Sequence, residues 1–302
     1  MNNAASSDPR RTQCLLCGGK ELALHKRGNL AGPATRKHLA VTDSAYGVTA
    51  DVYRCRACGF AQCAGMGDVL SEYRELEDAA YEAGRRHRAL QMRGLLRQLH
   101  PHCPGGRLLD IGAATGIFVE EARAAGYDAV GVEPAVAFQR IAAARGLPVH
   151  LGVHPHPGIQ GKFDVVTLVD VIEHVDDPVG LVRDAAEALV DGGCALVVTP
   201  DLGSLVARVM GARWWHYRAA HINYFDARTL GQLLDRFGLH TIGTFRPGWV
   251  FSVDYLRERL AGYCAVFGKL PLPPRLAAVS IPVNSRDSLG FIVRKEAATN
   301  SE

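Results

Sequence analysis

The sequence predicts an α/β protein with a doubly wound parallel sheet, preceded by a small cysteine-rich unit. Short apolar segments alternate with helical patterns of about one crossover length after residue 105, and one of these segments is a nearly continuous β-branched run. A duplicated Cys-x-x-Cys-Gly pattern before residue 60 predicts the separate unit. The 302 residues, 48% of them hydrophobic and 22% charged, suffice for one substantial core plus an appendage.

The first unit, residues 1–66, carries two cysteine pairs, Cys14 with Cys17 and Cys55 with Cys58, each followed by glycine. Two-residue spacing lets both thiolates of a pair reach one ion, and the glycine permits a tight turn. A redox motif would need only one such pair. Four thiolates complete a tetrahedron, so we expect structural Zn²⁺ that supplies much of the folding free energy of this unit.

The other cysteines, Cys63, Cys103, Cys194 and Cys264, have no partner at ligand spacing and are expected to be small core residues. The polar stretch 1–11 lacks the apolar region of a signal peptide, so we expect reduced thiols and a cytoplasmic location. No run approaches the eighteen apolar residues of a membrane span.

Residues 67–104 carry a helical pattern and are expected to form a helical cap or linker. The net charge of +3 excludes little, but the dense basic cluster is confined to residues 85–88. Nucleic-acid binders usually concentrate basic residues over a whole face. A nucleic acid is therefore not the expected partner.

An apolar run, residues 107–111, contains Asp110 near its end and is followed by Gly112 and Gly116. A helical pattern starts at Ile117, so the segment is interpreted as strand, tight turn and helix. At the carboxyl end of a parallel strand, the next helix presents unpaired N–H groups, and glycine lets a ligand approach the backbone. We expect the ligand site here.

A second short strand ends at Glu133, 23 positions after Asp110, where a carboxylate can accept both hydrogen bonds from a ribose diol. The dinucleotide fingerprint requires a middle glycine, but this chain has Ala114. The remaining pattern, Asp-x-Gly-x-x-x-Gly, places a carboxylate where it can bind a cation. It does not provide the glycine backbone that lies against a pyrophosphate. An ordinary strand-turn-helix is the alternative interpretation.

This segment resembles motif I of class I S-adenosylmethionine-dependent methyltransferases, with Glu133 as the ribose acid. The resemblance implies a seven-stranded Rossmann-like sheet with the last strand antiparallel, and S-adenosylmethionine as cofactor. It assigns cofactor binding to Asp110, Gly112, Ala113, Gly116, Phe118, Glu133, Pro134, Asp170, Val171 and Tyr81. By the same analogy Tyr73, Tyr81 and Arg88 face the methionine end or the substrate; tyrosines packed beneath a solvated helix face are the alternative.

The methyltransferase domain is placed at residues 105–296, with a substrate lid at 200–226, a helical insertion at 248–275 and a disordered tail at 297–302. Its further strands are expected at 147–151, 163–170, 195–200, 241–245 and 288–294. The resemblance implies that the last strand is inserted antiparallel between the fifth and the sixth.

The run from Asp170 to Pro178 closely resembles the motif that ends the fourth strand in the same class, across the cofactor from the substrate. His174 is therefore a candidate base or a residue that shapes the transfer pocket. Alternatively, it caps the next helix or contacts a backbone carbonyl.

Aromatic residues and histidines gather in the expected lid, among them Trp214, His221 and Tyr224. This pattern resembles bacterial methyltransferases of sugar, surface-glycan and secondary-metabolite pathways. The sugar C-methyltransferases among them share a four-cysteine N-terminal zinc domain and a Glu-His pair, but here Ala220 stands at the Glu position. Methylating carbon needs a stronger base than methylating a hydroxyl, so the missing carboxylate weakens the case for carbon.

We therefore expect a methyltransferase that acts on a hydroxyl of a small polar acceptor, such as a sugar, a glycan or a natural-product intermediate. The candidate catalytic residues are His221, His174 and Tyr224, with a histidine as the base. A sugar C-methyltransferase, an rRNA methyltransferase and a non-catalytic zinc-ribbon binding protein are the alternatives.

Overall fold

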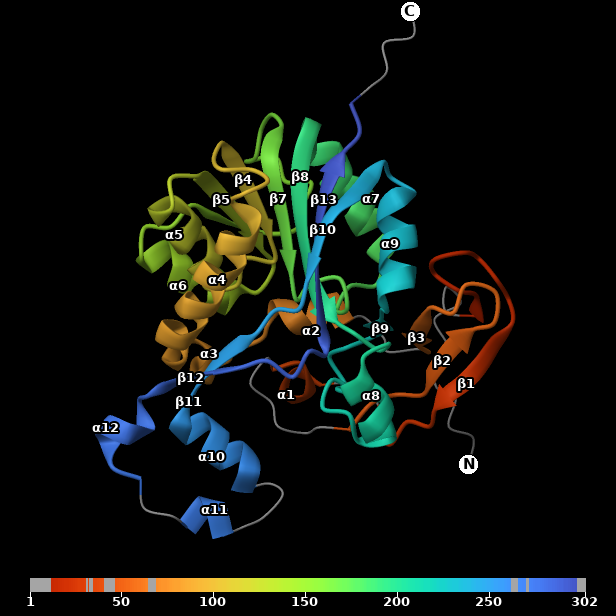
Figure 1. Ribbon diagram of the computed structural model, residues 1–302, viewed down its shortest axis with the longest axis vertical. Coiled ribbons are helices and arrows are strands. Elements are labelled where there is room, and N and C mark those ends of the chain that lie inside the picture. Colours follow the sequence, from red (N-terminus) through yellow and green to blue (C-terminus); the bar gives the residue numbers. More distant parts are fainter. Residues whose placement is uncertain are drawn as a thin grey trace, which may run out of the picture.

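The computed structural model describes residues 12–30, 32, 35–40, 47–64, 69–261, 266–269 and 272–297. They form a central sheet with helices on both faces, a smaller sheet beside its lower edge and a projecting helical unit (Figure 1). Cys264 and residues 1–11 and 298–302 lie outside the described residues.

The central sheet has seven strands in the order β10-β13-β8-β7-β4-β5-β6. Its strands are β4 (Arg107–Ile111), β5 (Asp128–Glu133), β6 (Val149–Leu151), β7 (Phe163–Val169), β8 (Leu189–Pro200), β10 (Leu239–Phe245) and β13 (Ser288–Lys295). The strands from β8 to β6 run parallel, whereas β13 is antiparallel to both of its neighbours, β8 and β10. The predicted doubly wound sheet, with its last strand inserted antiparallel, is confirmed.

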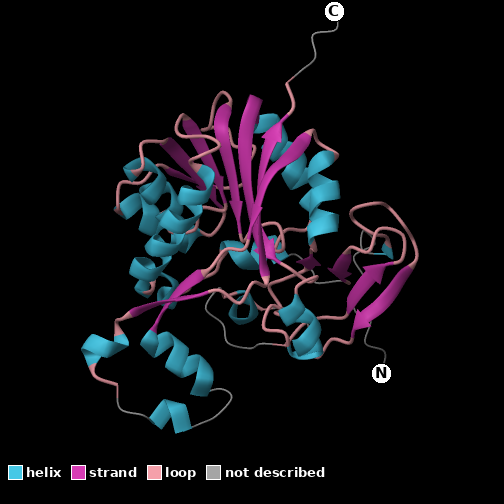
Figure 2. Ribbon diagram, viewed as in Figure 1, coloured by secondary structure: helices cyan, strands magenta, loops and turns pink. Residues whose placement is uncertain are grey.

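Helices cover both faces of this sheet (Figure 2). They are α4 (Arg85–Leu99), α5 (Ile117–Ala124) and α6 (Val136–Ala144) on one face, and α7 (Pro178–Ala188) and α9 (Ala227–Asp235) on the other. Successive side chains of a strand point to opposite faces. Accordingly, Leu108 packs in the core cluster with α4 and α5, and its neighbour Leu109 packs in the cluster with α7 and α9.

A second sheet, of order β1-β2-β3-β9, joins the cysteine-rich unit to the expected lid. Its strands are β1 (Leu22–Lys26), β2 (Val52–Cys55), β3 (Ala61–Cys63) and β9 (Asn223–Tyr224). The ring of Phe60 packs against Phe225, with centroids 4.9 Å apart, and both rings lie in the same core cluster as Leu109. The cysteine-rich unit is thus built into the main core and does not hang from a linker.

The helical stretch before the main sheet is divided into separate helices. Short helices α1 (Arg36–Leu39), α2 (Val69–Arg74) and α3 (Ala79–Ala83) precede α4. Asp78 begins α3, because its side chain accepts a hydrogen bond from the backbone N–H of Tyr81 at 3.1 Å. Between α2 and α3, Leu76 is 1% exposed and packs on Phe138 of α6. These contacts hold α2 and α3 over the carboxyl ends of β4 and β5.

The expected lid contains α8 (Leu205–Met210) and a 3₁₀ turn, Gly211–Arg213. Trp214 is fully buried, and its indole N–H donates to Asp287 Oδ2 at 3.0 Å, so this ring fixes the lid to the segment before β13. Trp214 therefore has a packing role.

The stretch that was expected to be a helical insertion begins with a strand. β11 (Trp249–Ser252) pairs antiparallel with β12 (Ser280–Val283), and α10 (Val253–Ala261), α11 (Val266–Lys269) and α12 (Pro274–Ala277) lie between them. The apolar run of β11 passes directly into the pattern of α10, which explains why the sequence pattern suggested one helix. Among the described residues, every helix is too short or too polar to span a bilayer.

We expect Phe60→Ala to lower the free energy of unfolding by about 3–5 kcal/mol, because the ring is fully buried where the two sheets meet. Leu24→Ala, on exposed β1, is the matched control and should cost less than about 1 kcal/mol. Urea unfolding followed by circular dichroism measures both. Equal, small effects would contradict the shared core.

Candidate functional site

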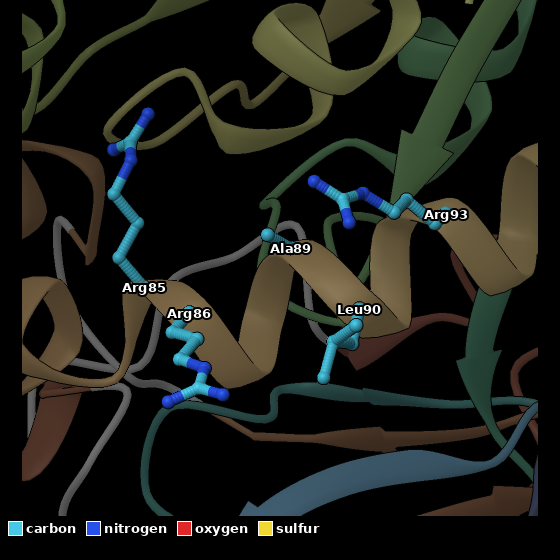
Figure 3. Close-up of a pocket in the computed structure, with 5 residues that line it drawn as sticks. All are labelled: Arg85, Arg86, Ala89, Leu90 and Arg93. Atoms are coloured by element: carbon cyan, nitrogen blue, oxygen red, sulfur yellow. The ribbon is translucent and has the colours of Figure 1, made fainter. Parts of the chain in front are cut away.

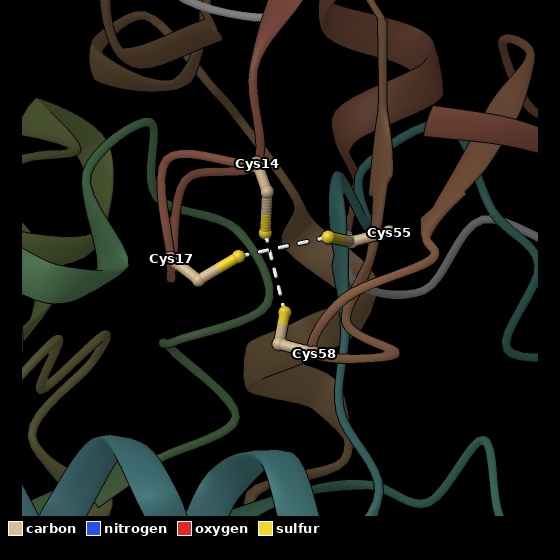
Figure 4. Close-up of side chains that lie close together, drawn as sticks. All are labelled: Cys14, Cys17, Cys55 and Cys58. Carbon is tan, nitrogen blue, oxygen red and sulfur yellow. Dashed lines mark hydrogen bonds between the residues drawn. The ribbon is translucent and has the colours of Figure 1, made fainter. Parts of the chain in front are cut away.

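The four predicted ligand cysteines converge on one point (Figure 4). Cys14 Sγ lies 3.4 Å from Cys58 Sγ, Cys17 Sγ lies 3.6 Å from Cys55 Sγ, and all four sulfurs fall within 4.8 Å of one another. Tetrahedral Zn²⁺ with Zn–S bonds of about 2.3 Å places sulfurs roughly 3.8 Å apart. The donor set therefore fits a zinc ion with no open position.

The backbone of the loop after β4 requires glycine at two positions. Gly112 has φ +80°, and a Cβ added there would lie 2.5 Å from Val171 Cγ2. Gly116 has φ +75°, and a Cβ there would lie 2.8 Å from Leu147 Cδ1. Ala114, between them, also has positive φ, at +46°. Such backbone is rare for non-glycine residues, so contacts elsewhere in the site must hold the loop in this form.

The two predicted acids are both buried beside this loop. Asp110 is 3% exposed and accepts a hydrogen bond from Thr167 Oγ1 at 2.6 Å. Glu133 is fully buried and accepts from the backbone N–H groups of Ala114 at 2.8 Å and Ala135 at 2.7 Å. Burial raises the pKa of each acid to about 7, although these hydrogen bonds oppose the shift. The contact with Ala114 explains how Glu133 stabilises the strained loop.

Helices α2 and α3 place tyrosines over these acids. The side chain of Tyr73 lies near the Glu133 carboxylate, and burial, with the charge of Glu133, raises the pKa of Tyr73 well above its usual value. The ring of Tyr81 lies 5.1 Å from that of Phe138. The guanidinium of Arg88 stacks on Tyr81 at 3.9 Å from the ring centroid. Arg88 Nε is buried and has no hydrogen-bond partner among the described residues.

A surface pocket of about 520 Å³ lies along α4 and is lined by Arg85, Arg86, Ala89, Leu90 and Arg93 (Figure 3). Arg85 pairs with Glu82 and Glu120, and Arg93 pairs with Glu121, so much of the positive charge is matched. Arg85 also donates to the carbonyl oxygen of Thr115 in the glycine loop at 3.2 Å. This pocket contains none of the predicted site residues, and of its arginines Arg85 supports the loop from outside.

The loop after β7 brings further polar groups to the same edge of the sheet. Asp170 has φ +54°, and burial raises its pKa to about 7 while Arg88 and Arg218 oppose the shift. His174 Nδ1 lies 2.8 Å from the carbonyl oxygen of Ala220, to which it donates. Burial, with a smaller effect of Arg218, lowers the pKa of His174 to about 4.

The structure brings His174 and His221 together, with ring centroids 4.8 Å apart in an edge-on arrangement. His221 is 5% exposed, and burial lowers its pKa well below the usual value. His216 stacks on His221 at 5.7 Å, and its Nε2 lies 3.4 Å from Asp287 Oδ2. Both imidazoles of the central pair are therefore neutral at pH 7.

The other predicted residues occupy different surroundings. Phe118 and Ala113 are buried in the core cluster of α4 and α5. Pro134 is half-buried beside Glu133. Tyr224 is 3% exposed and packs against Tyr217 in the cluster that also contains Cys63, on the side of the cysteine-rich unit. Its role as a catalytic residue stays a prediction.

Sequence reasoning did not assign a role to Glu173, although this residue precedes His174 in the recognised motif. Glu173 is 1% exposed and accepts a hydrogen bond from Thr199 Oγ1 at 2.9 Å through Oε2. The sequence did contain a signal for Glu173, because a carboxylate next to a histidine at the end of a buried strand is typical of functional sites.

A family model described as "Methyltransferase domain" matches residues 82–243, which is more than half of the 302 residues. The ubiquinone biosynthesis O-methyltransferase of Bordetella avium is 30% identical over 39% of this chain and 54% of its own length. The corresponding protein of Caulobacter sp. is 32% identical over 36% of this chain and 48% of its own. The chain thus spans about half the length of the curated relatives that it matches.

Among solved structures, a SAM-dependent methyltransferase from Archaeoglobus fulgidus is similar over 72% of this chain and 100% of its own, with 16% identity and a TM-score of 0.48. The match to the family model, and not this structural likeness, carries the assignment.

The double variant Cys17→Ser/Cys58→Ser should lose the tightly held zinc and unfold at a lower temperature, because the metal supplies folding free energy to the small sheet. Mass-spectrometric metal analysis and thermal unfolding measure the two effects. Cys63→Ala, a buried cysteine outside the cluster, is the control and should keep its zinc. Unchanged zinc content in the double variant would contradict the four-thiolate site.

Proposed function

The chain belongs to the family defined by the methyltransferase domain, and from this premise we propose that it transfers the methyl group of S-adenosylmethionine to a hydroxyl of a small polar acceptor. The observation that carries the proposal is the pair of buried acids, Asp110 and Glu133, on either side of the strained glycine loop. An ionised carboxylate buried in such surroundings carries a high desolvation free energy. A cationic ligand with a ribose diol compensates that cost.

In this proposal Glu133 accepts hydrogen bonds from the ribose hydroxyls, and the loop from Gly112 to Gly116 lies along the methionine end. The Tyr73 side chain, which lies near Glu133, takes the place that a ribose hydroxyl needs. Tyr73 must therefore move away with α2 when the donor enters. The short length of α2, Val69–Arg74, suits a cap that opens at low cost.

The charges of the methionine end also find partners. Its ammonium suits Asp110, and its carboxylate suits Arg88, whose buried Nε lacks a partner among the described residues. Asp170 and Val171 complete the wall at the end of β7, where Val171 Cγ2 limits the space above Gly112. These roles match a zwitterionic ligand with an additional sulfonium charge.

Transfer itself requires the acceptor oxygen, the methyl carbon and the sulfur to lie in line, because the sulfonium already supplies an excellent leaving group. The acceptor then lies against His174 and His221, which face this edge from the loop after β7 and from the lid. Their available ring nitrogens are the places to which the acceptor can direct its hydroxyl proton.

Oxygen is the favoured acceptor atom for two reasons. The curated relatives named above are O-methyltransferases. In addition, Ala220 supplies only a backbone carbonyl, used by His174, where carbon methylation would benefit from a carboxylate. A sugar, a glycan or a natural-product intermediate is the proposed class of acceptor.

We expect the affinity for S-adenosylmethionine to rise as the pH increases through about 7 and to level off above it. The donor favours ionised Asp110 and Glu133, and both acids have a pKa of about 7 in the free protein, so affinity is lost as they become protonated. Glu133→Gln should raise Kd at pH 8 by about tenfold or more and flatten the profile.

Isothermal titration calorimetry at pH 6, 7 and 8 measures this dependence. Glu187→Gln, an exposed residue on the far helix α7, is the matched control and should bind like the unmodified protein. A Kd that is unchanged by Glu133→Gln, or an affinity that falls with increasing pH, would contradict the assignment of the donor site. Methyl transfer from labelled donor to a panel of hydroxylated small molecules then tests the acceptor class.

A further inference from the structure

Three side chains at the acceptor end of the proposed site direct unused ligand atoms toward one point. Glu173, His174 and His221 each offer one atom, and these atoms all lie within 4.8 Å of one another. Glu173 and His221 are 1% and 5% exposed. Glu173 Oε1 and His221 Nδ1 are buried and have no hydrogen-bond partner among the described residues. Buried polar atoms without partners are rare, so this pair requires an explanation.

The hydrogen bonds of the cluster fix which atoms are free. Glu173 binds Thr199 through Oε2, which leaves Oε1 directed at His174 Nε2, 3.9 Å away. His174 Nδ1 must donate, because its partner is the carbonyl oxygen of Ala220 at 2.8 Å, and Nε2 therefore carries the lone pair. Two lone pairs 3.9 Å apart cannot bond to each other, but they can share a cation.

His221 has a similar arrangement. Its Nδ1 is buried and has no hydrogen-bond partner among the described residues, so this nitrogen is available to a cation. His174, whose second nitrogen donates to the carbonyl oxygen of Ala220, has the usual form of a metal-binding histidine, because that bond fixes both tautomer and ring orientation. Burial lowers the pKa of both imidazoles, so they are neutral ligands at pH 7.

We propose that Glu173, His174 and His221 bind one divalent transition-metal ion, at a site separate from the four cysteines. Two imidazoles and one carboxylate suit Zn²⁺, Mn²⁺ or Fe²⁺, and three protein ligands leave a position open for an exogenous ligand. The four-thiolate site, in contrast, has no open position. Within the part of the chain that the structure describes, the proposal thus adds an open metal site to the closed one.

The role of this ion rests on the proposed function. The acceptor hydroxyl occupies the open position and releases its proton to water, because a bound cation lowers the pKa of an oxygen ligand. The oxygen lone pair then forms the O–C bond while the C–S bond breaks and its electron pair stays on sulfur. The products are the methylated acceptor, S-adenosylhomocysteine and one proton. With the ion bound, His174 and His221 act as its ligands, and release of the acceptor proton to water replaces the histidine base of the metal-free reaction.

The test is titration of Mn²⁺ into the zinc-loaded full chain, followed by electron paramagnetic resonance and calorimetry. Mn²⁺ prefers nitrogen and oxygen ligands and does not displace zinc from four thiolates. We expect saturation at one Mn²⁺ per chain. Glu173→Gln and His221→Asn should each weaken binding at least tenfold, while His100→Asn, at an exposed position after α4, should not.

Retained zinc and an unchanged circular dichroism spectrum establish that each variant is folded. Absence of saturable Mn²⁺ binding to the unmodified chain, or equal affinity in folded Glu173→Gln and His221→Asn, would overturn the metal site. The same preparations are titrated with S-adenosylmethionine. Donor binding without Mn²⁺ binding refutes the metal site alone, and Mn²⁺ binding without donor binding refutes the proposed function alone.

Discussion

The backbone hydrogen bonds of residues 222 and 223 connect the parts of this molecule. The carbonyl oxygen of Glu173, just after β7, accepts from the N–H groups of Ile222 at 2.8 Å and Asn223 at 3.1 Å. On the other side, the carbonyl oxygen of Ile222 accepts from the N–H of Cys63 at 2.8 Å. The Asn223 side chain donates to the carbonyl oxygens of Ile172 at 3.1 Å and Val175 at 2.7 Å. One short segment is therefore bonded to both sheets.

This arrangement gives the four-cysteine cluster a structural connection to the proposed acceptor site. The cluster fixes β2, β2 pairs with β3, and β3 pairs with β9, which begins two residues after His221. A zinc ion held by the cysteines would stabilise this path without contacting any reactant. The buried carboxylate of Asp287 also binds Trp214 and His216, so the middle of the lid is held as well.

The main sheet and the glycine loop could be predicted from the sequence because their signals are local. Arg107–Ile111 and Phe163–Val169 are apolar runs of strand length, and Gly112 and Gly116 mark the turn. The two-residue strand β9 could not be predicted, since its pairing with β3 joins residues more than 150 positions apart. Likewise, the partner of β11 lies beyond an intervening helical stretch, and nothing local distinguishes that strand from the helix that follows it.

The candidate site likewise contains residues that the sequence predicts and others that only the folded chain shows. Asp110 and Glu133 stand out because each ends a predicted strand, and their burial follows from that position. The free atoms of Glu173 and His221 depend on which nitrogen or oxygen is already bonded, and only the folded chain determines this. The contact of Tyr73 with Glu133 is similarly a result of how α2 packs over α6.

The central claim is that the carboxyl ends of β4 and β5 hold the adenosyl methyl donor. A crystal structure of the full chain with S-adenosylhomocysteine tests it most directly. We predict the ribose hydroxyls on Glu133, the amino-acid end beside Asp110, and Tyr73 displaced from its present contact. A ligand bound elsewhere, with Tyr73 still beside Glu133, would contradict the account.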